Sequence, residues 1–92
     1  MQGITVREGQ RVVIGSDVFV LESIDFNSSK SFISYVVAGE NGNVSDESVL
    51  HCGETVELLP DVEMRLARVT NSREPHVFME FDTQVGISIK GE

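Results

Sequence analysis

Apolar and polar residues alternate over residues 4–7, a pattern typical of a β-strand with one buried face. Residues 11–14 and 32–37 are rich in β-branched and apolar residues, residues 18–23 suit a strand covered on both sides, and residues 44–50 are suited to one more short strand. Clusters of Gly, Ser, Asn and Asp, which favour tight turns, lie at residues 15–17, 27–30 and 39–43. The pattern therefore predicts a series of short strands joined by turns.

The segment 61–69 is ambiguous, because its apolar residues match both helical and strand spacing. Its composition favours a helix, and Asp61 is a suitable N-cap residue. Seen alone, this segment predicts the one short helix that the chain has room for. An internal repeat decides for a strand.

The repeat becomes visible when Gly9 is aligned with Gly53. The alignment then pairs Val12 with Val56, Ile14 with Leu58, Asp17 with Asp61, Val18 with Val62, and Val20 with Met64. Both copies continue through a polar turn into a strand with aromatic residues. We therefore predict a single domain over residues 1–92 with copies at 1–50 and 51–92. Its fold is expected to be all-β, with small antiparallel sheets or a sandwich built from two similar β-units as a pseudo-dimer, and at most one short helix.

Composition and charge narrow the choice of partners. The 92 residues are 40% hydrophobic and 24% charged, which is typical of a folded domain. The formal net charge is −8, and each half, divided at His51, carries −4. Nucleic-acid binding depends largely on Lys and Arg that neutralise phosphates, so this spread of negative charge opposes non-specific binding of DNA or RNA.

The sequence predicts a cytoplasmic protein without membrane contact. Cys52 is the only cysteine, so no disulfide can form within the chain. The first residues lack the apolar run of a signal peptide, and the longest apolar runs are far too short to cross a bilayer.

Candidate catalytic and metal-binding residues are few. His51, Cys52 and His76 invite a metal or nucleophile interpretation, but they lack the spacing of a zinc site. Phosphate loops, hydrolase elbows and metalloprotease motifs are absent from the sequence. We therefore expect no catalysis, no metal and no cofactor.

Two stretches of the chain resemble a known family. REGQRVVIGSDVFV is similar to the start of the carbon storage regulator family (CsrA/RsmA), and CGETVELLPDV is similar to the same opening in a second copy. The resemblance covers about half of the chain. It implies the fold of small dimeric β-proteins that bind GGA-containing messenger RNA.

The resemblance also implies candidate contact residues. Ile4 and Arg7 match the family's RNA-contacting first strand, on which Thr5 is a third candidate. Val44, Ser45 and Asp46 align best with a Val-His-Arg stretch on its last strand but depart from it. Asp46 stands at the position of the Arg, which places an acceptor where RNA binding needs a donor.

Three functions stay open at this point. One is a non-catalytic regulatory module of the carbon storage regulator type, with RNA bound at a local edge. Another is an acidic inhibitor, of the kind made by phages and mobile elements, that occupies a basic surface of a host protein. The last is a structural assembly component that adds edge strands to its neighbours. Charge favours a protein partner over nucleic acid, and the expected state is a monomer or homodimer.

Overall fold

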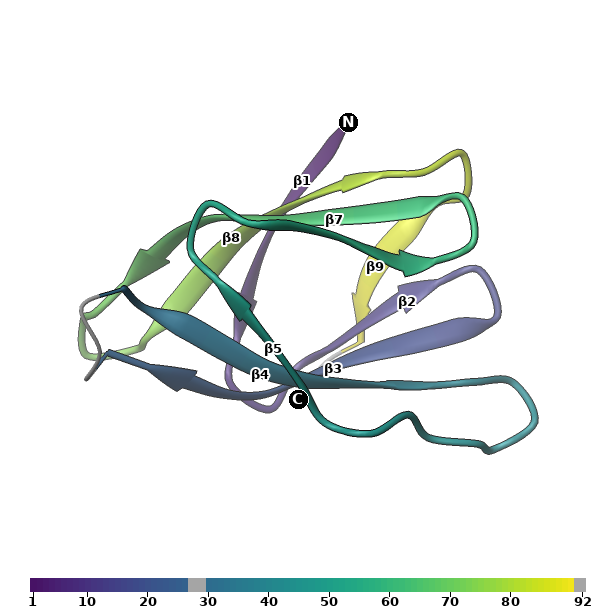
Figure 1. The fold of residues 1–92 in the computed structure, drawn as a ribbon, viewed down its shortest axis with the longest axis horizontal. Coiled ribbons are helices and arrows are strands. Elements are labelled where there is room, and N and C mark those ends of the chain that lie inside the picture. Colours follow the sequence, from purple (N-terminus) through teal and green to yellow (C-terminus); the bar gives the residue numbers. More distant parts are fainter. Residues whose placement is uncertain (27–29, 91–92) are drawn as a thin grey trace.

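The structure, a computed structural model, describes residues 1–26 and 30–90, and within them the chain forms strands and no helix (Figure 1). The strands are β1 (Gln2–Arg7), β2 (Arg11–Ile14), β3 (Asp17–Asp25), β4 (Phe32–Ala38), β5 (Ser48–His51), β6 (Thr55–Leu59), β7 (Val62–Thr70), β8 (His76–Asp82) and β9 (Ile87–Lys90). The predicted all-β fold is confirmed. The ambiguous segment 61–69 belongs to a strand from its second residue, as the repeat indicated, because β7 begins at Val62 and Asp61 lies in the turn before it.

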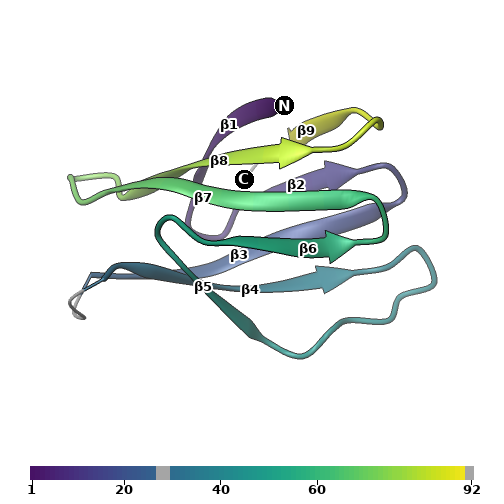
Figure 2. The ribbon, with the colours of Figure 1, turned by 45° about the horizontal axis from the view of Figure 1, so that its top comes forward.

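The strands form two antiparallel sheets that pack on each other. One sheet has the order β1-β8-β7-β6, and the other has the order β5-β4-β3-β2-β9. Figure 2 shows the hairpins β2–β3 and β6–β7 lying in the same direction, one from each sheet. Inward-facing side chains of both sheets fill the space between them. The largest fully buried ones are Phe19, Phe81, Leu21, Ile33, Met64, Leu66, Met79, Val6, Val12 and Val77.

The two halves of the chain exchange their first strands. Strand β1 pairs with β8 of the second half, and β5 pairs with β4 of the first half. The two registers agree. Arg7 of β1 lies opposite His76 of β8, and their counterparts, His51 (44 residues after Arg7) and Phe32 (44 residues before His76), also lie opposite each other. The halves are therefore related as the subunits of a strand-exchanged dimer would be.

The exchange also moves the boundary between the copies. We predicted copies at 1–50 and 51–92, but β5 is the counterpart of β1 and so belongs with the second copy. The predicted strand over residues 44–50 is shorter, because only Ser48–His51 pairs regularly with β4. Residues 27–29 of one predicted turn lie outside the described residues.

The predicted alignment of the copies is wrong after its first positions. Val12 and Val56 are equivalent, since Val12 lies opposite Phe19 and Val56 lies opposite Met64. A bulge then leaves Leu58 without a direct partner, so residues of β7 are related to those of β3 by 45 positions instead of 44. The offset returns to 44 between β4 and β8, where Phe32 corresponds to His76.

The bulge overturns the predicted equivalence of two valines. Val62 is buried, with 5% of its surface exposed, whereas Val18 is half-buried on the outer side of its sheet. By register, Val62 corresponds to Asp17, which lies at the same place beside the turn. The extra residue of the bulge in β6 shifts the register by one, so the predicted alignment pairs a residue that faces the core, Val62, with one that faces outward, Val18.

Candidate functional site

The first predicted contact residues lie on β1, at the edge of the four-stranded sheet. Thr5 and Arg7 point outward and are exposed, but Ile4 is half-buried and packs against the core. Nη1 of Arg7 lies 3.2 Å from Oε1 of Glu74, in an ion pair whose side chains are 54% and 76% exposed. A pair so exposed contributes little to stability. It places a carboxylate beside the guanidinium, where RNA would bring a phosphate.

The second predicted group, Val44 to Asp46, is held against the end of β4. The amide of Ser45 donates to the carbonyl of Val37 at 2.8 Å, and the amide of Val37 donates to Oγ of Ser45 at 2.9 Å. Val44 forms a single bridge with Ala38, although 60% of its surface is exposed. Asp46 is exposed beside it.

The structure does not bring the two predicted groups into one sheet. Ile4, Thr5 and Arg7 belong to the four-stranded sheet, whereas residues 44–46 follow β4 in the five-stranded sheet. The first-strand segment beside β4 is β5, the counterpart of β1. The six residues therefore do not form one continuous strand surface.

A different set of residues forms a row of like charges on the four-stranded sheet. Glu57 lies directly opposite Glu63, and Glu63 lies directly opposite Asp82, so the three carboxylates follow one another across β6, β7 and β8. All three are exposed, and no ion pair shown for the described part of the chain includes them. We call these three residues the acidic row. Like charges directly opposite one another destabilise a sheet, so the row favours a cationic partner.

The neighbouring rank of side chains shows the contrast. Two residues along the strands, on the same face, Arg65 lies opposite Glu80, and Nη1 of Arg65 lies 2.8 Å from Oε1 of Glu80. That rank neutralises its own charge. With Asp61 from the β6–β7 turn, the acidic row lines a hollow at the end of the sheet.

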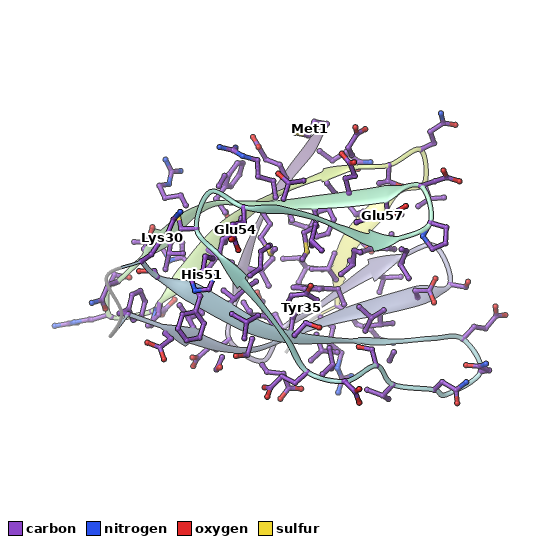
Figure 3. All side chains as sticks on the ribbon, viewed as in Figure 1. Met1, Lys30, Tyr35, His51, Glu54 and Glu57 are labelled. Atoms are coloured by element: carbon purple, nitrogen blue, oxygen red, sulfur yellow. The ribbon has the colours of Figure 1, made fainter. Side chains whose placement is uncertain are left out.

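A second hollow lies between β6 and the end of β4. Its lining includes Tyr35, Val37, Ser45, Val56, Leu58 and Leu59. Tyr35 is buried, and this burial raises the pKa of its phenol, while a hydrogen bond with Ser48 acts in the opposite direction. Figure 3 shows Tyr35 on β4 and Glu57 on β6. We call this hollow the β6 groove.

Equivalent turns join each exchanged strand to the next one. Gly9 and Gly53 adopt left-handed backbone angles, with φ of 84° and 92°. Behind each glycine, a side-chain oxygen accepts a hydrogen bond from the amide three residues earlier. Oε1 of Gln10 accepts from Arg7 at 2.8 Å, and Oε1 of Glu54 accepts from His51 at 2.9 Å.

This hydrogen bond changes the acidity of Glu54. The pKa of Glu54 is lowered, chiefly by the backbone hydrogen bond from His51, with help from the His51 side chain and the charge of Lys30. Figure 3 shows Glu54 and His51 close together at this turn. Gln10 provides the same acceptor at the first turn without an ionisable group.

The two turns predict a difference in acid stability. A carboxylate whose pKa is lowered by folding stabilises the protein above its unfolded pKa, and that stability is lost as the pH falls through the lowered pKa. Glu54→Gln keeps an acceptor and removes the titration. We therefore expect the unsubstituted protein to lose more stability than Glu54→Gln between about pH 5 and pH 3, measured by urea denaturation. Equal losses in the two proteins would contradict the assigned role of Glu54.

The residues considered for metal binding are engaged elsewhere. His51 lies beside Glu54, Nδ1 of His76 lies 2.9 Å from the carbonyl of Glu74, and Sγ of Cys52 lies 3.8 Å from the carbonyl of Ala67. Over residues 1–26 and 30–90, no group of His, Cys, Asp and Glu side chains has the arrangement of a metal site.

The acidic row and the β6 groove were both missed by sequence reasoning. Alternation places Glu57 and Glu63 on the outer side of their strands, but only the register shows that they stand opposite each other and Asp82. The available signal was the position of Glu57 and Glu63 on either side of the turn at Pro60 and Asp61, which is the spacing of residues that can face each other across a hairpin.

Comparisons with known proteins give no further assignment. No family model, no curated protein and no solved structure matches this chain. Within the described part of the chain, no helix has the length and apolar character needed to span a membrane.

Proposed function

We propose that this protein is a non-catalytic regulatory module that binds the basic surface of another protein. The acidic row carries the proposal, because its three carboxylates lie side by side on an exposed sheet face and, within residues 1–26 and 30–90, none of them takes part in an ion pair. A cationic side chain placed there relieves repulsion and gains attraction. The net charge of −8 adds long-range attraction toward a basic partner. This is the manner in which an acidic inhibitor occupies a host protein, and the lone thiol of Cys52 fits work in the cytoplasm.

The resemblance to the carbon storage regulator family contributes architecture to this proposal. Two similar units that exchange first strands are what a single-chain counterpart of such a dimer requires. Its RNA-contacting role is less well supported, since Arg7 is paired with Glu74 and Asp46 stands in place of a basic residue. We therefore propose an architecture like that of the family together with a different partner.

Retention of proteins from a cell lysate tests the proposal. The immobilised protein should retain basic proteins after nuclease treatment, and raised salt should release them, because exposed charges are screened beyond about 10 Å at 0.1 M ionic strength. Retention that disappears on nuclease treatment would support RNA as the partner instead. Retention unaffected by salt would contradict recognition by charge.

A further inference from the structure

Strand β9 shows how one edge of this fold is closed. It pairs with β2 in the five-stranded sheet, where Ile89 lies opposite Val12 and Ile87 lies opposite Ile14. Both isoleucines are half-buried and pack against the core. Ser88, between them, is exposed on the outer face. The pattern that closes this edge is therefore apolar, polar, apolar.

The equivalent edge in the other half has no such strand. Strand β6 is the counterpart of β2, and within residues 1–26 and 30–90 it pairs only with β7. The residues that lie 44 positions before β9 are 43–46, which are tied to β4 through Ser45 and Val44. Figure 2 shows β6 at the end of its sheet, with β7 as its neighbour. The repeat is thus complete except for the strand that would cover β6.

The β6 groove lies where that strand is missing. Val56 is the counterpart of Val12, which Ile89 faces in the other half. Val56 and Leu59 are half-buried and pack against the core, as Leu58 also does. The groove therefore presents apolar side chains of β6 beside an open strand edge, with Asp17 and Ser48 on its opposite side. An open edge can exchange backbone hydrogen bonds with an added strand.

Charge defines the side chain that suits the middle of the added strand. Ser88 of β9 lies opposite Val13, and the counterpart of Val13 on β6 is Glu57. A residue in the position of Ser88 would thus stand directly opposite Glu57, at the open end of the acidic row. Lys or Arg there pairs with Glu57 on the outer face, while its two neighbours point into the groove.

We propose that β6 binds an extended segment of a partner protein by strand addition, with the sequence pattern apolar, Lys or Arg, apolar. The segment occupies the place at β6 that β9 occupies at β2. This inference rests on the proposed function, because it takes the partner to be a basic protein. It adds the binding mode and the residue pattern that the partner presents.

A second copy of this chain suits the edge less well. Antiparallel pairing of two β6 strands about their centres would set Glu57 against Glu57 of the other copy. Each copy also carries a net charge of −8. Repulsion therefore opposes self-pairing and favours a cationic segment.

A peptide made from the chain's own β9 tests the inference. The probe is a peptide of residues 84–90 carrying Ser88→Lys, and the matched control peptide carries Ser88→Glu. Both are titrated into the full protein while backbone amide signals are followed by NMR. We expect the lysine peptide to shift the signals of β6 and the end of β4, and to bind about two- to fivefold more tightly than the peptide without substitution. The glutamate peptide should bind more weakly than either.

The charge pairing is tested by reversing it. In the protein variant Glu57→Lys, the order of the two substituted peptides should invert, so that the glutamate peptide binds more tightly. Lysine peptides in which Ile87 and Ile89 are both replaced by Asp should not bind in either protein. Shifts confined to β2, from displacement of β9, would overturn the inference, and so would an unchanged order of peptides in Glu57→Lys.

The outcomes separate this inference from the proposed function. Strand addition is overturned if basic proteins are still retained in excess lysine peptide and the peptide causes no NMR shifts at β6. The proposed function then stands, provided that the retention remains sensitive to salt. Loss of both retention and peptide binding overturns both. Self-association through β6 would also overturn the inference. It would be seen as a dimer whose formation is changed by Glu57→Lys, together with β6 signals that no peptide shifts.

Discussion

Leu21→Ala and Leu66→Ala are each expected to lower the free energy of unfolding by about 2–5 kcal/mol, and by similar amounts. The two leucines are fully buried, and each lies on the long middle strand of its half, just before a bulge. Each also makes the same pair of backbone hydrogen bonds. The carbonyl of Leu21 accepts from the amide of Gly9, and its amide donates to the carbonyl of Gln10. Leu66 makes the same two bonds with Gly53 and Glu54. Truncation leaves a cavity in the same place of two similar units.

Urea denaturation measures this comparison, with Val18→Ala as the control. Val18 is half-buried and faces outward, so its truncation should cost roughly 1 kcal/mol or less. One leucine variant severely destabilised with the other close to neutral would show that the halves are not equivalent in energy. The strand-exchanged account of the repeat would then fail.

Glu63→Lys is expected to raise stability and to abolish binding of the basic partner. Glu63 is the middle residue of the acidic row, with Glu57 on one side and Asp82 on the other. Lysine there replaces two repulsive pairs by two attractive ones, each worth about 0.2–1 kcal/mol, so a gain of about 0.5–2 kcal/mol is expected. The same substitution removes the charge pattern that attracts the partner. A gain in stability coupled with a loss of binding is typical of a functional site.

The matched control is Glu40→Lys, which makes the same change of net charge in an exposed loop. Urea denaturation at low and high salt gives the stability, and retention of basic proteins from nuclease-treated lysate gives the binding. Equal loss of retention in both variants would show that net charge alone attracts the partner. A destabilised Glu63→Lys would contradict the electrostatic account of the row.

Local patterns predicted most of the strands because alternation and turn residues act within a few positions. The repeat also corrected the helical propensity of 61–69, where pairing with β6 and β8 outweighs intrinsic preference. The alignment failed beyond Val56 because a one-residue bulge leaves no signature in the sequence. Strand β9 was not predicted, since its four residues depend on distant pairing with β2.

The candidate site was predicted less well than the fold. The residues chosen by resemblance, Ile4 to Arg7 and Val44 to Asp46, were assigned from a linear match, and strand exchange places them on different sheets. The acidic row depends on which residues of β6, β7 and β8 stand opposite one another. Register is fixed by the whole core and by bulges, so residues as far apart as Glu57 and Asp82 could not be joined from their spacing.

Titration with GGA-containing RNA hairpins tests most directly whether the partner is a protein or RNA. A labelled hairpin and a matched hairpin without GGA should both bind weakly or not at all at low and at physiological salt, because the chain carries −8 and Asp46 replaces a donor. The salt-sensitive retention of basic proteins should persist in the presence of excess hairpin. Tight binding that requires GGA and is lost in Arg7→Ala would contradict the account and make this protein an RNA-binding regulator.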